Sequence, residues 1–302
     1  RNKSKPHVIV IGLLYSDTYS LLMNLGRSYR WEAEFVGLDQ LESLPQTINS
    51  KTAMIFTETI TNPLLEIPDL ERIGEIASEH CVPFVVDNTV GTPVNCQPLD
   101  YNADYVIHST TKYLSGSNDH AGGAVLVKNS MDANALENFQ RCWEMKISHL
   151  EAEALWEYMQ DFQERMERFN TNGTILAEFL AEHFAVDFVY HPSLNSHSSY
   201  YTAKKLLSGN GGVVSFTLKD ESENALKKFY DREFSSIIKA PSIGSNQTLI
   251  CPYTLLTNYF YTDEELKEIN LPRHLIRVSA GCETEFDSIL EDLDFALKRI
   301  VH

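Results

Sequence analysis

The segment VVDNTVGTPVNCQPLDYNADYVIHSTTKYLSG, residues 85–116, decides the fold class of this 302-residue chain. It contains two short apolar runs rich in β-branched residues, one ending at Asp87 and the other at Ser109. Runs of this length and composition are typical of buried β-strands. Four further runs of the same kind lie outside the segment. The resulting strand predictions are HVIVIG (7–12), EAEFVGL (32–38), AMIFTET (53–59), PFVVDNT (83–89), DYVIHS (104–109) and GGAVLVK (122–128).

Helical segments separate several of these strands, most clearly IPDLERIGEIASEH (67–80). There Leu70, Ile73 and Ala77 share one helix face, and Pro68 suits the first turn. Alternating strands and helices predict an α/β fold, a mostly parallel sheet with helices on both faces. Ligands of such sheets bind at the carboxyl ends of the strands. Glu58, Asp87 and Ser109 all lie at these ends.

The second half of the chain has a different pattern. From about Glu151 to Leu180, apolar residues recur every three or four positions, which indicates a long helix or a helix pair broken near Gly173. Two strands follow, at 211–219 and 274–281, and TDEE (262–265) and TEFD (284–287) resemble capping boxes. We therefore predict a large domain at residues 1–150 and a smaller C-terminal α+β domain at 151–302 that begins with a long helix.

Composition disfavours several classes of protein. The formal net charge of −17, with no basic stripe, opposes nucleic-acid binding. No apolar run reaches 18 residues, and the N-terminus lacks a signal-peptide cleavage site. The five cysteines have no CxxC spacing, which argues for reduced thiols and against a zinc site. These features predict a cytoplasmic protein with no metal, membrane or nucleic-acid partner.

Lys112 is the residue with the most specific chemical surroundings. A lysine after a strand is ordinarily solvated, but Ser109 and Thr111 add two hydroxyl donors of the kind that a phosphate needs. A lysine that condenses with an aldehyde must first lose its proton, which burial and nearby positive charge favour. A phosphorylated aldehyde, pyridoxal 5'-phosphate (PLP), would use all three residues. PLP also needs a carboxylate beside its pyridine nitrogen, and Asp87 is the candidate, although it could instead only cap a turn.

Several segments together resemble a known family, the PLP-dependent Cys/Met metabolism enzymes of the cystathionine γ-synthase and γ-lyase group. The resemblance covers nearly the whole chain and is most specific between residues 56 and 125. It implies a PLP-dependent transferase fold of type I, PLP as cofactor, small amino-acid substrates and a homodimer or homotetramer. The segments that carry it are ETITNPLLEIPDLERIGEIASEH (58–80), residues 85–116, GGAVLV (122–127), MERFNTNGTILAEFL (166–180), AKKLLSGNGGVVSFTL (203–218), PSIGSNQTL (241–249) and LIRVSAGCE (275–283).

The resemblance also implies roles for individual residues. Lys112 matches the lysine that binds the cofactor and transfers protons, and Asp87 matches the partner of the pyridine nitrogen. Tyr15 matches a tyrosine that stacks on the cofactor ring and assists proton transfer. The phosphate would be bound by Ser109 and Thr111, and the substrate by Asn62, Ser242 and Arg277. Simpler roles remain open for three of them: an internal ion pair for Arg277, a helix-start aromatic for Tyr15 and a turn former for Asn62.

The chain departs from the family pattern at four places. Family sequences begin well upstream of KPHVIVIG (5–12), with an arm and a glycine-methionine turn that contact the phosphate, so we expect a longer protein and weak PLP binding by residues 1–302 alone. Pro241 stands where a glutamate is common. NQTLICPYTLLTNYF (246–260) and EYMQDFQER (157–165) replace the usual segments at their positions. These departures bear on the substrate rather than on the cofactor.

The favoured function is replacement or elimination at the γ- or β-carbon of a sulfur-linked or O-acylated amino acid. Synthesis of cystathionine from an O-acylhomoserine and cysteine comes first, and a cystathionine or methionine C–S lyase is the alternative. A relative without PLP, acting as a binding or assembly partner, is the alternative from another class. A nicotinamide dehydrogenase is weaker, because VIVIGLLYSD (8–17) lacks the GxGxxG pattern.

Overall fold

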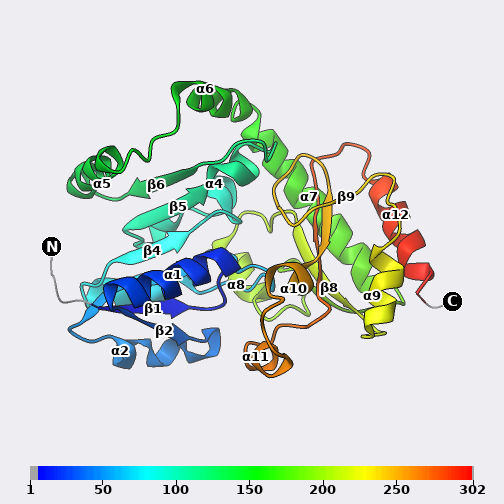
Figure 1. Ribbon diagram of the computed structural model, residues 1–302, viewed down its shortest axis with the longest axis horizontal. Coiled ribbons are helices and arrows are strands. Elements are labelled where there is room, and N and C mark those ends of the chain that lie inside the picture. Colours follow the sequence, from blue (N-terminus) through cyan, green and yellow to red (C-terminus); the bar gives the residue numbers. More distant parts are fainter. Residues whose placement is uncertain (1–5, 301–302) are drawn as a thin grey trace.

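The computed structural model describes residues 6–300, which form two β-sheets with helices packed against them (Figure 1). The first sheet has six strands in the order β2-β1-β3-β4-β5-β6. Neighbours from β2 to β5 are parallel, and β6 is antiparallel to β5. All six predicted strands are confirmed. Their bounds are β1 His7–Ile11, β2 Glu32–Val36, β3 Thr52–Glu58, β4 Phe84–Asp87, β5 Tyr105–Ser109 and β6 Gly123–Val127.

Both faces of this sheet are covered, because successive residues of a strand point to opposite sides. In β1, Val8 and Val10 pack toward α1 (Ser16–Tyr29), which contributes Leu22. Ile9 and Ile11 belong to the core on the other face, which includes Ile73 of α3 (Leu70–Glu79). The strand therefore reads as a continuous apolar run rather than an alternating one.

The second sheet has five strands in the order β7-β8-β11-β10-β9. Its core is separate from that of the first sheet. The long helix α7 (Phe162–Glu182) contributes Met166 and Phe169 to the first core and Leu176 and Leu180 to the second. The strand bounds are β7 Val186–Tyr190, β8 Val213–Leu218, β9 Ile238–Lys239, β10 Leu249–Pro252 and β11 Ile276–Ser279.

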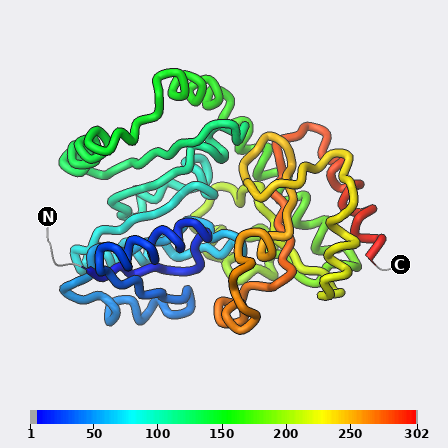
Figure 2. Tube along the Cα trace, viewed as in Figure 1, coloured from blue at the N-terminus to red at the C-terminus, as the bar shows by residue number. Residues whose placement is uncertain are grey.

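The colours of Figure 2 follow this division, with blue to green around the first sheet and yellow to red around the second. The fold is thus α/β, as predicted, with a mostly parallel first sheet. The boundary at residue 150 stays a prediction. The other helices are α2 Leu44–Thr47, α4 Thr92–Asn95, α5 Ser130–Cys142, α6 His149–Tyr158, α8 Tyr200–Leu206, α9 Glu223–Tyr230, α10 Tyr253–Thr257, α11 Asp263–Glu268 and α12 Asp287–Lys298.

Two local predictions about helices were wrong, and one of two alternatives for a third region is excluded. Of the long helix and the helix pair broken near Gly173, the break at Gly173 is excluded, because Gly173 is inside the long helix α7 and the interruption lies between Tyr158 and Phe162. A Cβ on Gly173 would lie 2.2 Å from the Gly211 carbonyl oxygen, so this glycine allows a close approach rather than a break. Pro68 precedes Asp69, the residue that caps α3, and is therefore outside the first turn. TEFD forms no capping box, since α12 begins at Asp287 without a side-chain cap. The box at TDEE is confirmed, with Thr262 and Glu265 capping α11.

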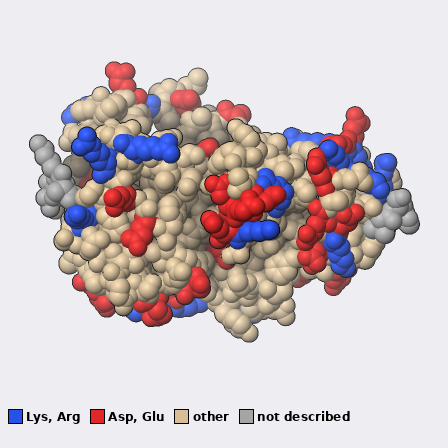
Figure 3. Space-filling view, turned by 60° about the horizontal axis from the view of Figure 1, so that its bottom comes forward, with Lys and Arg blue, Asp and Glu red and all other residues tan. Residues whose placement is uncertain are grey.

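The distribution of charged side chains on the surface agrees with the negative net charge of the sequence. On the face drawn in Figure 3, Asp and Glu side chains gather near the middle, and Lys and Arg side chains form no continuous stripe. Within residues 6–300, no helix combines the length and the apolar character needed to cross a membrane.

Candidate active site

The carboxyl ends of β3, β4 and β5 meet at one edge of the first sheet. Strand register pairs Glu58 with Asp87, and Asp87 with Ile107 two positions before Ser109. A pocket opens there, closed on the far side by residues of the second sheet and its loops. It is lined by Tyr15, Glu58, Ile60, Asn62, Asp87, Thr89, Val90, Ser109, Lys112, Pro241, Ile243 and Arg277.

Lys112 reaches this pocket from a one-turn π-helical segment, Thr110–Leu114, that directly follows β5. Its own backbone leaves the helical conformation, with φ −90° and ψ −126°. The Nζ atom donates to Ser242 Oγ at 2.8 Å. Burial, followed by the charge of Arg277, lowers the pKa of Lys112 below its usual value, and Asp17 opposes this shift. A larger share of neutral amine at neutral pH follows than for a surface lysine.

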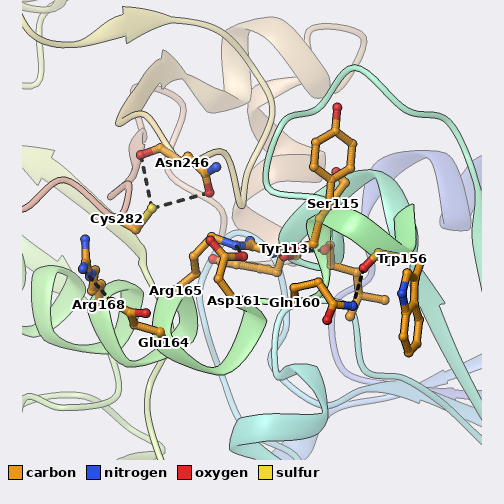
Figure 4. Close-up of polar contacts among 12 residues, drawn as sticks. Tyr113, Ser115, Trp156, Gln160, Asp161, Glu164, Arg165, Arg168, Asn246 and Cys282 are labelled. Carbon is orange, nitrogen blue, oxygen red and sulfur yellow. Dashed lines mark hydrogen bonds and ion pairs between the residues drawn. The ribbon is translucent and has the colours of Figure 1, made fainter. Parts of the chain in front are cut away.

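The turn that carries Lys112 is held by side chains at four successive carbonyls. Ser115 Oγ lies within hydrogen-bond distance of the carbonyl oxygens of Thr111 and Lys112, at 3.0 and 3.3 Å. Arg165 donates from Nη1 to the Tyr113 carbonyl at 2.9 Å and from Nη2 to the Leu114 carbonyl at 3.2 Å. Figure 4 shows Arg165 on α7 beside Tyr113 and Asp161. Because the Arg165 guanidinium is buried, its fixed fork of donors constrains this turn.

Two carboxylates lie side by side at the base of the pocket. Asp87 Oδ1 accepts from the Thr89 backbone N–H at 2.9 Å, and within residues 6–300 no cationic side chain pairs with it. Burial raises the pKa of Asp87. Glu58 accepts backbone N–H groups of Tyr15 and Asn62 at 2.7 and 3.2 Å. Burial, and then the charge of Asp87, raise the pKa of Glu58 well above its usual value. The pocket therefore favours a cation beside Asp87.

Arg277 enters the pocket from β11 in the second sheet and is only 2% exposed. Its Nη1 donates to Asn62 Oδ1 at 3.1 Å, and its Nη2 donates to the carbonyls of Pro241 and Ser242. The guanidinium carbon lies 4.6 Å from the centre of the Tyr253 ring. None of the ion pairs formed within residues 6–300 includes Arg277, contrary to the internal ion-pair alternative. A buried guanidinium with neutral partners is suited to an anionic ligand.

Tyr15 precedes the first turn of α1, at the rim of the pocket. Its hydroxyl donates to Asp17 Oδ2 at 3.0 Å. Burial, and then the hydrogen bond to Asp17, raise the pKa of Tyr15 to about 12. The phenol is therefore protonated at neutral pH.

The structure brings most of the predicted site residues together, but not all in the same way. Ser109 lines the pocket, whereas Thr111 is outside the lining, and its Oγ1 accepts the Gly122 N–H at 3.2 Å. Ser242 is also outside the lining but contacts Lys112. The roles of these residues remain proposals.

Sequence reasoning missed three residues of the site. Glu58 was placed at a strand end but given no role. The usable signal was that an ionisable residue ends a predicted strand, as Asp87 does, and the structure makes the two register partners. Thr89 Oγ1 accepts the Ser109 N–H at 2.8 Å. Asn118 contacts Ser242, and nothing in the local pattern points to it.

The comparisons with known proteins agree on one family. A sequence profile described as "Cys/Met metabolism PLP-dependent enzyme" matches residues 3–298. A cystathionine β-lyase of Lactococcus lactis subsp. cremoris is 33% identical over 293 residues, covering 97% of this chain and 76% of the relative. A cystathionine γ-synthase of Mycobacterium leprae is 33% identical, covering 96% of this chain and 74% of the relative. An L-methionine γ-lyase of Fusobacterium nucleatum subsp. nucleatum is 32% identical, with 99% and 75% covered.

Solved structures agree with the sequence relatives. A cystathionine γ-lyase from Lactobacillus plantarum, complexed with L-serine, superposes with a TM-score of 0.93 at 28% identity, covering 99% of this chain and 77% of that one. A cystathionine γ-synthase from Xanthomonas oryzae pv. oryzae superposes with a TM-score of 0.91 at 29% identity, with the same shares covered. Proteins named for different reactions are thus similar to this chain to about the same degree.

Proposed function

The chain belongs to the Cys/Met metabolism PLP-dependent enzymes, and we propose that within this family it catalyses replacement or elimination at the γ-carbon of an amino acid. The favoured reaction is formation of cystathionine from an O-acylhomoserine and cysteine. The observation that supports the proposal is the meeting of Lys112, Asp87 and Arg277 in one pocket. Judged by the described residues, they supply an amine of lowered pKa, a buried carboxylate that forms no ion pair and a guanidinium without a counter-ion.

These residues fit PLP. Asp87 is a buried carboxylate with no cationic partner among the described residues, as a site for a pyridinium nitrogen requires. Lys112 presents an amine of lowered pKa to the same pocket, and Ser109 also lines it. We propose that Asp87 holds the pyridine nitrogen, Lys112 binds the aldehyde carbon, and Ser109 and Thr111 contribute to phosphate binding.

When bound, PLP supplies an electron sink for negative charge on the substrate α-carbon. Lys112 Nζ is then the group that takes the proton from that carbon, because its lowered pKa makes the neutral amine more accessible than in a surface lysine. Arg277 orients the amino acid by binding its α-carboxylate, and Asn62 Oδ1 keeps one arm of the guanidinium in place. Tyr15 retains its own proton and acts as a donor or a stacking surface rather than a base.

Arg277→Lys should raise KM for any amino-acid substrate by about 10- to 100-fold, the effect of losing one charge-assisted hydrogen bond. A lysine places one point charge where the guanidinium presents a planar fork, so the paired contact with a carboxylate is lost. Steady-state kinetics on the folded variant measure this effect. Arg273→Lys, which changes an exposed ion pair with Asp263, is the matched control. An unchanged KM in Arg277→Lys would place the carboxylate site elsewhere.

Asp17 bears on the choice of substrate. It is exposed near the pocket rim, and its charge acts on Lys112 as well as on Tyr15. A carboxylate there would attract a second ammonium group, such as that of an incoming cysteine or of the distal half of cystathionine. This supports cystathionine chemistry over cleavage of methionine.

A C–S lyase acting on cystathionine remains the alternative function. The intact Lys112 and Asp87 disfavour the other alternative, a relative that has lost PLP.

The function is tested by incubating the PLP-loaded enzyme with O-acetyl-, O-succinyl- and O-phosphohomoserine, each with and without cysteine, and separately with cystathionine and with methionine. Cystathionine formation with kcat/KM at least about tenfold above that of any cleavage reaction, a difference of roughly 1.4 kcal/mol in barrier, is the expected result. Faster release of a 2-oxo acid from cystathionine or methionine would instead support the lyase.

We further propose that the enzyme is a homodimer or homotetramer, and one apolar surface supports this. Segment 130–158, from α5 through α6, carries large apolar side chains that are mostly exposed and face away from both cores. Phe139 and Trp143 lie with ring centres 5.8 Å apart on it. Contiguous apolar patches of this kind mark interfaces in soluble proteins. The exposed members are Met131, Phe139, Trp143, Met145, Ile147, Leu150 and Trp156.

Replacing both Trp143 and Trp156 by aspartate should convert the oligomer to a smaller species. Burying each indole contributes about 1.5–3 kcal/mol or more, so the double change should weaken association by at least about 100-fold. Sedimentation velocity over a concentration series measures the shift. Tyr201→Asp, at an 82% exposed aromatic on α8, is the control and should leave assembly unchanged. Equal assembly of all three proteins would exclude this surface as the interface.

A further inference from the structure

The loop between β9 and β10 lies directly against the turn that carries Lys112. Gly244 has φ +69°, and a Cβ there would lie 2.6 Å from the Tyr113 backbone nitrogen. The Gly244 N–H also donates to Ser279 Oγ at 3.1 Å, which ties the loop to β11. Only glycine allows this approach, and the approach brings Ser242 beside Lys112.

The Ser242 hydroxyl has two polar contacts, one with Lys112 and one with Asn118. It accepts from Lys112 Nζ at 2.8 Å and lies 2.5 Å from Asn118 Oδ1. A hydroxyl has one proton to donate. The orientation of that proton decides whether Ser242 acts as an acceptor or as a donor toward the Lys112 amine.

The orientation of the Asn118 amide follows from its second contact. Its Nδ2 donates to the Ile243 carbonyl at 3.3 Å. Turning the amide over would set Oδ1 against that carbonyl oxygen, so the drawn orientation is the favourable one. The backbone of Asn118 is left-handed, with φ +59°, a conformation that asparagine adopts more readily than most residues. Oδ1 therefore faces Ser242, and an amide oxygen can only accept.

We propose that Asn118 is a positioning residue that binds the Ser242 proton and so keeps the Ser242 oxygen as an acceptor for the Lys112 amine. Without Asn118, the hydroxyl could rotate and donate its proton to the lone pair of neutral Lys112. With Asn118 in place, neutral Lys112 donates an N–H to Ser242, and its lone pair stays free for the pocket. The proposal rests on the proposed function only for its consequence in catalysis.

Other charges act on the same amine. Arg277 lowers the pKa of Lys112, Asp17 raises it, and Tyr15, Glu58 and Asp87 line the same pocket. A hydroxyl fixed as an acceptor favours the ammonium form, whereas one free to donate favours the neutral form. Loss of Asn118 should therefore shift the titration of Lys112 to lower pH while making the neutral amine less reactive.

The test titrates Lys112 itself in the full chain without PLP, by competitive labelling with acetic anhydride and mass spectrometry between pH 6 and 11, a range that brackets the ordinary lysine value on the order of 10.4. In Asn118→Ala, the titration midpoint should fall, and the limiting labelling rate at high pH should drop about 2- to 10-fold, the range of one hydrogen bond. Asn118→Asp still accepts the Ser242 proton, so the limiting rate should be retained while the added charge raises the midpoint.

A cycle with Ser242→Ala decides whether Asn118 acts through Ser242. In that background, Asn118→Ala should have no further effect on Lys112. Ser117→Ala, in the same loop, should match the wild type, and circular dichroism should show all variants folded. An unchanged limiting rate in Asn118→Ala, or an equal effect with and without Ser242, would overturn the proposal. Because the readout needs neither PLP nor substrate, it does not depend on which reaction the enzyme catalyses.

Discussion

Replacing Lys112 by alanine should abolish turnover, with kcat at least about 10⁴-fold below the wild type, the upper range of a single acid–base group. The change removes both the amine that binds PLP and the base that takes the α-proton. No other lysine lines the pocket within the described residues. Lys204, for example, lies over the Tyr200 ring on α8 and is exposed. Replacement by a nearby amine is therefore not expected.

The attachment is tested by reduction with sodium borohydride followed by peptide mapping. The wild type should carry a pyridoxyl group on Lys112, and Lys112→Ala should carry none. Lys204→Ala, the matched control, should be labelled and active like the wild type. A label on Lys204 or Lys205 in the wild type would refute the assignment of Lys112.

Asp87→Asn should lower kcat by more than about 100-fold while the fold is retained. An asparagine has nearly the same shape and can still accept the Thr89 N–H, so the end of β4 should be undisturbed. A neutral amide, however, cannot stabilise a protonated pyridine nitrogen, and the electron sink is lost. Loss of one charge-assisted hydrogen bond, about 1.5–3 kcal/mol, should also weaken PLP binding by about 10- to 100-fold.

Kinetics at saturating PLP separate these two effects, and a PLP titration measures the second. Asp100→Asn, an exposed aspartate outside the pocket, should behave as the wild type. Near-normal kcat in Asp87→Asn would mean that Asp87 only caps the turn after β4.

The sequence was sufficient for the first sheet and for the residues that define the chemistry. Inner strands of that sheet, such as β1 and β4, are short, continuous apolar runs because both of their faces are covered, and this pattern can be read locally. Asp87 and Lys112 are recognisable for a related reason. Each is an ionisable residue at the end of such a run, where the parallel topology gathers ligands. Arg277, inside an apolar strand of the second sheet, depended on the resemblance to a known family.

Errors in the local predictions came from contacts between distant segments. Gly173 weakens a helix in isolation, yet α7 continues through it because the backbone at Gly211 approaches too closely for a side chain. The break before Phe162 coincides with Arg165, whose Nη2 donates at 2.6 Å to the carbonyl of Tyr158, the last residue of α6. The same guanidinium donates to the carbonyls of Tyr113 and Leu114, in the turn that carries Lys112, about fifty residues earlier in the chain.

The sequence by itself therefore determined the strands of the first sheet, their order of appearance and the amine and carboxylate at their ends, because hydrophobic period is a local property. In the second sheet it predicted only β8 and β11 of the five strands. The tertiary structure alone decided the pairing of Glu58 with Asp87, the placement of Arg277 over the first sheet, and the contact of Asn118 with Ser242. Asn118 and Ser242 are 124 residues apart, and their contact exists only because two separately formed sheets pack at one pocket. No periodicity in the chain encodes such a distance, so the hydrogen bonds that orient the reactive amine could be read only from the folded protein.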